Sequence, residues 1–125
     1  MDNVKPSNFA ADLHYGQKGE VYVNSILTAT IKDVEVKTDR RWKSTGNLFI
    51  EVWCWSDNKK EWYPSGLQIS LATHWSFVLE EVVLTVPINQ LKQTVKKYGK
   101  PIECSIPPNY SKGYLIKATD LLKTY

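Results

Sequence analysis

A run of alternating charged and uncharged residues, KDVEVKTD at positions 32–39, constrains the fold of this chain more than any other stretch. Four of its charged side chains fall two residues apart: Asp33, Glu35, Lys37 and Asp39. On a β-strand such side chains project from one face, because successive residues point to opposite sides. The run therefore predicts a strand over roughly residues 30–38. Its charged face is either exposed to water or part of a metal site.

Size and composition indicate one ordinary globular domain. The chain has 125 residues, of which 42% are apolar and 23% are charged, and its net charge of +3 is only mildly basic. The two cysteines and two histidines lack the spacing of a zinc site. No segment approaches the roughly 20 apolar residues of a membrane span, and the N-terminus lacks the apolar stretch of a signal peptide. We therefore expect a single cytoplasmic domain over residues 1–125 that does not associate with a membrane.

The apolar patterns predict both helices and strands. A helix is expected over residues 10–27, and a central strand over residues 47–55, which are rich in aromatic and β-branched side chains. The segments HWSFVL and VVLTV predict two more strands, followed by a helix that starts at Pro87 and stops at Gly99. The segment YLIKA predicts a short last strand. This order indicates an α+β or mixed α/β domain, with a small central mixed sheet flanked by helices.

Further residues bear on the choice between a solvated strand and a metal site. Glu51 is the one acidic residue of the predicted central strand, and an unpaired buried carboxylate is costly. Glu20 lies on the first predicted helix, directly after a glycine. The loop after the charged strand is basic and contains a tryptophan: Arg40, Arg41, Trp42 and Lys43. Carboxylates hold hard cations and basic side chains hold phosphates, so the combination suggests hydrolysis of a phosphodiester.

The pair Glu35 and Lys37 suits that chemistry. A phosphodiester is anionic and resists attack by water, so Mg²⁺ is needed to offset the developing charge. A neighbouring lysine can orient the water or stabilise the transition state. Two residues apart on a strand, Glu35 and Lys37 project from the same side at a backbone separation of about 7 Å. This separation leaves room for one water molecule between the two side-chain tips.

Four sequence blocks carry a family resemblance. In chain order they are GxxGE at 16–20, EVKTD at 35–39, TGNLFIEV at 45–52 and PSG at 64–66. Together they resemble small phage and bacterial members of the PD-(D/E)XK nuclease superfamily, over roughly residues 12–79. The resemblance implies a restriction-endonuclease-like core. It also implies a Mg²⁺-dependent endonuclease that acts on DNA, with Mn²⁺ able to substitute for Mg²⁺.

The resemblance also implies roles for individual residues. Glu35 and Lys37 match the Glu-x-Lys pair, and Glu20 matches a helix glutamate that many members use at the metal site. The aspartate of the superfamily is open between two assignments. The preferred set uses Asp33, whereas the other takes Asp39 with Glu51 and puts Trp53 at the lysine position. The expected catalytic residues are Lys37, Glu35 and Glu20, and the expected metal ligands are Glu20, Asp33, Glu35, Asp39 and Glu51.

Nucleic-acid contacts are expected from the basic loop. Arg40, Arg41 and Lys43 would meet the phosphate backbone or remain solvated, and Trp42 would stack on bases. The other tryptophans are expected mostly in the core. DNA is the expected partner, RNA stays open, and a homodimer is one option, because two-fold symmetry matches duplex DNA. The alternatives are a catalytically inactive nucleic-acid-binding or assembly protein on the same fold, and a structural domain with a solvated acidic strand.

Overall fold

The computed structural model describes residues 9–27, 33–39, 42–105 and 110–123. Contacts divide the chain into two compact units, Met1–Thr30 and Ile31–Tyr125. The first unit contains α1 (Phe9–Leu27), which confirms the predicted helix. None of the helices in the described ranges has the length and apolar character needed to cross a membrane. The single domain expected from the sequence stays a prediction.

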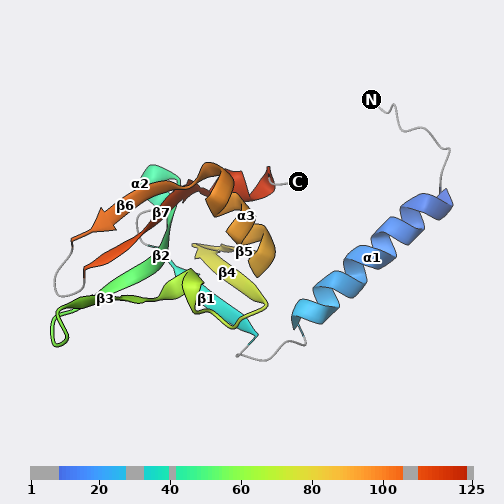
Figure 1. The fold of residues 1–125 in the computed structure, drawn as a ribbon. Helices are drawn as coiled ribbons and strands as arrows, with labels where there is room; N and C mark the ends of the chain where they lie inside the picture. Colours follow the sequence, from blue (N-terminus) through green and yellow to red (C-terminus); the bar gives the residue numbers. More distant parts are fainter. Residues whose placement is uncertain (1–8, 28–32, 40–41, 106–109, 124–125) are drawn as a thin grey trace. The chain divides into compact units, whose positions relative to one another are not determined.

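The described residues of the second unit form two β-sheets (Figure 1). The first sheet has the strand order β1-β4-β5, in which β1 runs parallel to β4 and β5 runs antiparallel to it. The second is antiparallel, with the order β3-β2-β7-β6. The strand bounds are β1 Val34–Thr38, β2 Asn47–Ser56, β3 Glu61–Pro64, β4 His74–Leu79, β5 Val82–Pro87, β6 Lys100–Cys104 and β7 Ser111–Lys117. The predicted α+β class is confirmed, but the strands form two sheets where one central sheet was expected.

Short helices complete the second unit. α2 (Trp42–Thr45) connects β1 to β2, and two 3₁₀ turns, η1 (Gly66–Gln68) and η2 (Ala118–Leu122), follow β3 and β7. The longer α3 (Ile88–Tyr98) begins directly after Pro87, one residue later than predicted, and ends before Gly99 as predicted. Proline suits the start of a helix because the first N–H groups have no helical partner. α3 packs against β4, β5, β7 and η2.

Both sheets and α3 contribute to one hydrophobic core. Its most deeply buried apolar side chains are Leu48, Ile50, Trp75, Leu91 and Ile116. Burying an apolar side chain of this size contributes about 1.5–3 kcal/mol, so these residues hold the two sheets and α3 together. The expectation that most tryptophans lie in the core is wrong: only Trp75 is fully buried, and Trp42 packs half-buried against the core. The remaining three tryptophans lie on β2 and β3, outside the core cluster.

A glycine allows β7 to pass closely by β2. The register of the two strands shifts between Glu51 and Trp53, so β2 carries a bulge at this point. Gly113 lies opposite Glu51, and a Cβ atom at position 113 would collide with the carbonyl oxygen of Ile50. Only a residue without a side chain allows this approach of the two backbones.

Gly113→Ala should therefore lower the free energy of unfolding by about 1–3 kcal/mol, because the added methyl group overpacks the strand crossing. Urea unfolding followed by tryptophan fluorescence measures this, since all five tryptophans lie in the second unit. Gly16→Ala is the matched control. A Cβ atom at Gly16 would meet nothing within 4 Å, so this variant should not lower the midpoint. If Gly113→Ala and the unchanged protein have equal midpoints, the approach of β2 and β7 at Gly113 does not exclude a side chain.

Candidate functional site

The charged residues of β1 lie on the side of their sheet that faces the core. In the parallel pairing with β4, Glu35 lies beside Trp75 and Lys37 beside Phe77. Neighbouring residues in register share a face, and Trp75 and Phe77 are only 1% and 2% exposed. The intervening Val36, on the outer face, is 62% exposed. This arrangement differs from the solvated-strand alternative, in which the charged residues would take the outer face.

Glu35 and Lys37 form an ion pair, and the ammonium group of Lys37 lies over the buried ring of Trp75. The Lys37 Nζ atom lies 2.7 Å from Oε1 of Glu35 and 4.7 Å from the ring centre of Trp75. The other carboxylate oxygen of Glu35 accepts a hydrogen bond of 2.7 Å from the hydroxyl of Ser70. Ser70 in turn accepts a 2.9 Å hydrogen bond from the indole N–H of Trp75. A chain of contacts therefore connects the buried indole to the carboxylate through one hydroxyl group.

The surroundings of Glu35 favour its ionised form. Partial burial by itself raises the pKa of this carboxyl group, but hydrogen bonds from Lys37 and Ser70 and the positive charge of Lys37 outweigh that effect. The pKa of Glu35 consequently lies below its usual value of 4.5. At neutral pH the site presents a carboxylate anion next to an ammonium group.

Asp39 connects the end of β1 to the second sheet. Its Oδ2 atom accepts a 3.1 Å hydrogen bond from the backbone N–H of Phe49 in β2. Lys37 and Asp39 both line a cleft of about 500 Å³, whose other walls come from both sheets. Phe49, Phe77 and Leu115 give the cleft an apolar lining. The cleft therefore has an apolar lining, and it is bordered by one positively charged side chain, Lys37, and one negatively charged side chain, Asp39.

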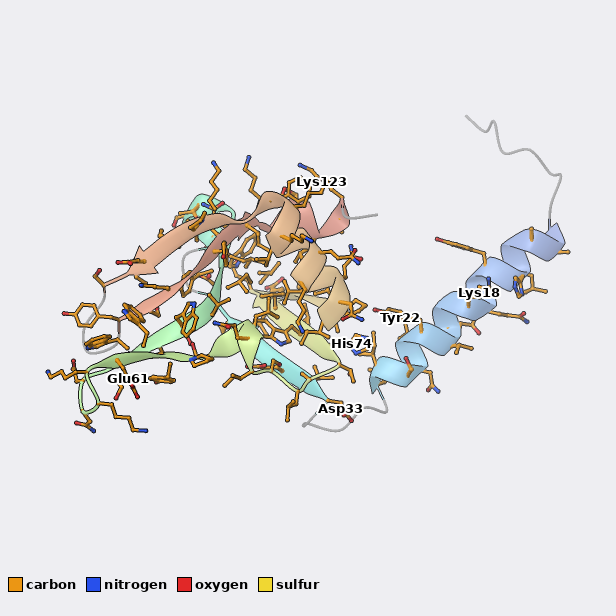
Figure 2. The ribbon with its side chains drawn as sticks, in the orientation of Figure 1. Lys18, Tyr22, Asp33, Glu61, His74 and Lys123 are labelled. Carbon is orange, nitrogen blue, oxygen red and sulfur yellow. The ribbon has the colours of Figure 1, made fainter. Side chains whose placement is uncertain are left out.

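Three other predicted metal ligands lie on segments other than β1. Asp33 precedes β1, and its carbonyl oxygen accepts hydrogen bonds from the backbone N–H groups of Thr73 (2.8 Å) and His74 (3.1 Å). Figure 2 shows Asp33 and His74 close together at the starts of β1 and β4. Glu51 is half-buried on β2, which belongs to a different sheet from β1. Glu20 is exposed on α1 in the first unit, so its part in the site stays a prediction.

The basic loop is described only in part. Arg40 and Arg41 lie outside the described residues. Lys43 is on α2 and forms an exposed ion pair of 2.7 Å with Glu80. Trp42 packs half-buried against the core. The predicted roles of these residues in nucleic-acid binding stay predictions.

Within the described ranges, no three His, Cys, Asp or Glu side chains gather as a group that could hold a metal ion. Mg²⁺ often takes only one or two carboxylates and completes its coordination with water and substrate phosphate. Glu35 fits this requirement, because it is ionised and a carboxylate has about four acceptor sites, of which Lys37 and Ser70 use two. Glu35 and Asp39 lie about 13 Å apart along an extended chain, so one ion would not take both.

Ser70 and Trp75 are the site residues that sequence reasoning missed. Ser70 lies 35 positions after Glu35, in a loop with no recognisable motif. Trp75 reads as an ordinary core residue, and only its register with Glu35 brings its indole N–H near the site. No signal within a short window of sequence could have found either residue.

Ser70→Ala should destabilise the protein by about 1–3 kcal/mol, because it leaves the buried indole N–H of Trp75 without its acceptor and removes one donor to Glu35. Ser70→Thr keeps the hydroxyl group and should retain most of the stability. Urea unfolding of both variants measures the difference. If the alanine variant is as stable as the threonine variant, the hydroxyl bridge has no structural role.

Glu35→Gln should destabilise the protein in a pH-dependent way. Because folding lowers the pKa of Glu35, ionisation stabilises the folded state above the usual value of 4.5, and this stabilisation is lost as the pH falls through the folded pKa. Glutamine cannot ionise, so the variant should be less stable than the unchanged protein at about pH 7, and the gap should narrow as the pH falls below 4.5. Denaturant unfolding over a pH series measures the gap. A gap of constant size would show that the charge of Glu35 contributes nothing.

Known proteins give no independent support for an assignment of this site. No protein-family model, no curated protein and no solved structure matches the chain. The resemblance to PD-(D/E)XK nucleases therefore rests on the four sequence blocks and stays a prediction.

Proposed function

We propose that the protein is a Mg²⁺-dependent endonuclease that hydrolyses phosphodiester bonds in DNA, on a restriction-endonuclease-like core. The observation that carries this proposal is the pair Glu35 and Lys37. Its carboxylate and ammonium groups are 2.7 Å apart on one face of β1, and Lys37 borders a cleft of about 500 Å³. Phosphodiester hydrolysis needs an anionic ligand that holds a hard cation, and Glu35 can be that ligand. It also gains from a fixed positive charge next to the reacting group, which Lys37 can supply.

The two side chains have separate roles in this proposal. Glu35 is the ligand that the structure supports best, because Ser70 and Lys37 hold its carboxylate in place. A bound Mg²⁺ would supply positive charge to offset the charge that develops on the phosphodiester. Lys37 would position the attacking water. The Trp75 ring under its ammonium group restricts the conformations that the Lys37 side chain can adopt. Glu20 and Asp33 remain candidates for completing the metal site with Glu35. Asp39 and Glu51 belong to the other assignment, and Mn²⁺ can substitute for Mg²⁺.

The basic loop would supply contacts to DNA. Lys43 is 73% exposed in its ion pair with Glu80, and an exposed pair of this kind contributes little energy. A phosphate group can therefore replace Glu80 as its partner. RNA stays open as a substrate, and a homodimer would let two sites act on the two strands of a duplex.

A catalytically inactive nucleic-acid-binding or assembly protein is the second candidate. One observation favours it: both carboxylate oxygens of Glu35 already accept hydrogen bonds from side chains of the protein. A carboxylate whose two oxygens both have partners inside the fold can have a structural role without any metal. This candidate predicts DNA binding without cleavage.

Incubation of plasmid, linear and branched DNA with the protein and Mg²⁺ or Mn²⁺ tests the proposal. The unchanged protein should cut at least one of these substrates, and EDTA should abolish cutting. Glu35→Ala and Lys37→Ala should each slow cleavage by about 10²-fold to 10³-fold, because each removes a charge that acts on the transition state. Gel electrophoresis of the products measures the rates. Alanine variants of Glu20, Asp33, Asp39 and Glu51 would then identify the remaining ligands.

Lys123→Ala is the matched control, because Lys123 also pairs with a carboxylate, that of Asp120 at 3.5 Å, but near the C-terminus. Its cleavage rate should equal that of the unchanged protein. If all three substrates stay intact with either metal, the enzyme proposal fails. If Glu35→Ala or Lys37→Ala cuts as fast as Lys123→Ala, that residue is not part of the site.

A further inference from the structure

Three aromatic rings form a row across the second sheet, beyond the core. Trp55 of β2 lies opposite Trp62 of β3, and the two ring centres are 5.4 Å apart. The backbone N–H of Trp55 also donates to the carbonyl of Tyr110 at 2.9 Å, just before β7 begins. All three rings line one hollow of about 340 Å³. None of them belongs to the core cluster of the second unit.

A second row lies next to the first on the same face. Trp53 of β2 pairs with Lys112 of β7, which pairs with Glu103 of β6. Side chains two residues apart on a strand share a face, so Trp53 lies beside Trp55. Trp53 and Lys112 line another hollow, of about 330 Å³. We call this face, with Trp53, Trp55, Trp62, Tyr110 and Lys112, the aromatic platform.

The platform is open to solvent. Trp53 is 36% exposed and Tyr110 is 40% exposed, and Trp55 and Trp62 are half-buried. β2, β3, β6 and β7 continue past α3 in Figure 1, and in Figure 2 Glu61 labels the start of β3 at that end. Soluble proteins seldom leave several large aromatic side chains together in water unless another molecule covers them.

One cation lies among these rings. The Nζ atom of Lys112 is 4.1 Å from the ring centre of Trp62 and 3.6 Å from a carboxylate oxygen of Glu103. The Glu103 side chain is 67% exposed, so this ion pair contributes little. Lys112 can therefore turn to an anionic partner while the rings contact a planar one. Single-stranded nucleic acid matches this surface, because its flat bases are joined by an anionic backbone. It binds other antiparallel sheets by base stacking.

We propose that the aromatic platform binds single-stranded DNA, with unpaired bases stacked on Trp55 and Trp62 and the ammonium group of Lys112 on the phosphate backbone. This binding uses neither a metal ion nor the pair Glu35 and Lys37, so it goes beyond the proposed nuclease activity and stands without it. If both hold, the preferred substrate contains an unpaired segment, as a forked duplex with single-stranded arms does.

Fluorescence anisotropy of a fluorescein-labelled oligo-dT strand, measured in EDTA, tests the platform without cleavage. The unchanged protein should bind the strand, and salt should weaken binding. Trp62→Ala should weaken it about 5-fold to 150-fold, the fold-change that corresponds to the loss of one stacked base. Trp62→Phe keeps a ring and should retain most of the affinity. Lys112→Ala should flatten the dependence of affinity on salt, because one phosphate contact is lost.

Tyr63→Ala is the matched control, because Tyr63 adjoins Trp62 on β3, is 44% exposed and points to the opposite face. It should bind as the unchanged protein does. An abasic strand of the same length, which keeps the phosphates, should bind much more weakly than oligo-dT. The proposal is wrong if oligo-dT does not bind, if the abasic strand binds equally well, or if Tyr63→Ala weakens binding as much as Trp62→Ala. It is also wrong if a neutral oligosaccharide or a proline-rich peptide binds the platform more tightly than oligo-dT.

Discussion

The parallel pairing of β1 with β4 decides where the charged groups of the candidate site lie. It puts Glu35 beside Trp75 and Lys37 beside Phe77, on the side of the sheet that faces the core. A shift of one residue would turn both charges to the outer face and bring Val36 inward. The ion pair, the hydrogen bond from Ser70 and the stacking of Lys37 on Trp75 all depend on this register.

The site therefore takes its rigidity from the core. Trp75 is both a core residue and, through its indole N–H, the base of a chain that reaches Glu35 by way of Ser70. A side chain held by packing on one side and hydrogen bonds on the other has few rotamers open to it, which is what a catalytic or binding geometry needs. The aromatic platform has a different basis, because its rings lie outside the core cluster and take their order from strand registers.

Local sequence patterns predicted the helices and strands that have a clear apolar periodicity or a clear residue at which a helix ends. The helix between Pro87 and Gly99 and the two strands before it were found in this way. β6 was missed because KPIEC has little apolar alternation and gains its strand geometry from pairing with β7. The division into two sheets and the exposure of Trp53 depend on pairings between distant segments, which no short window reveals. The pair Glu35 and Lys37 was predicted to share a face, whereas its partner Ser70 became visible only in three dimensions.

The orientation of β1 has one more consequence, which concerns association between molecules. Among the described residues β1 is one of the two edge strands of its sheet, and its exposed Val36 would suit pairing with a strand from another chain. Glu35 and Lys37 oppose such pairing, because an added strand would hinder the access of their charged ends to water. Inward-pointing charges on an edge strand are a known means of preventing edge-to-edge aggregation. The two residues proposed for catalysis would thus also make β1 a poor partner for the edge strand of another chain.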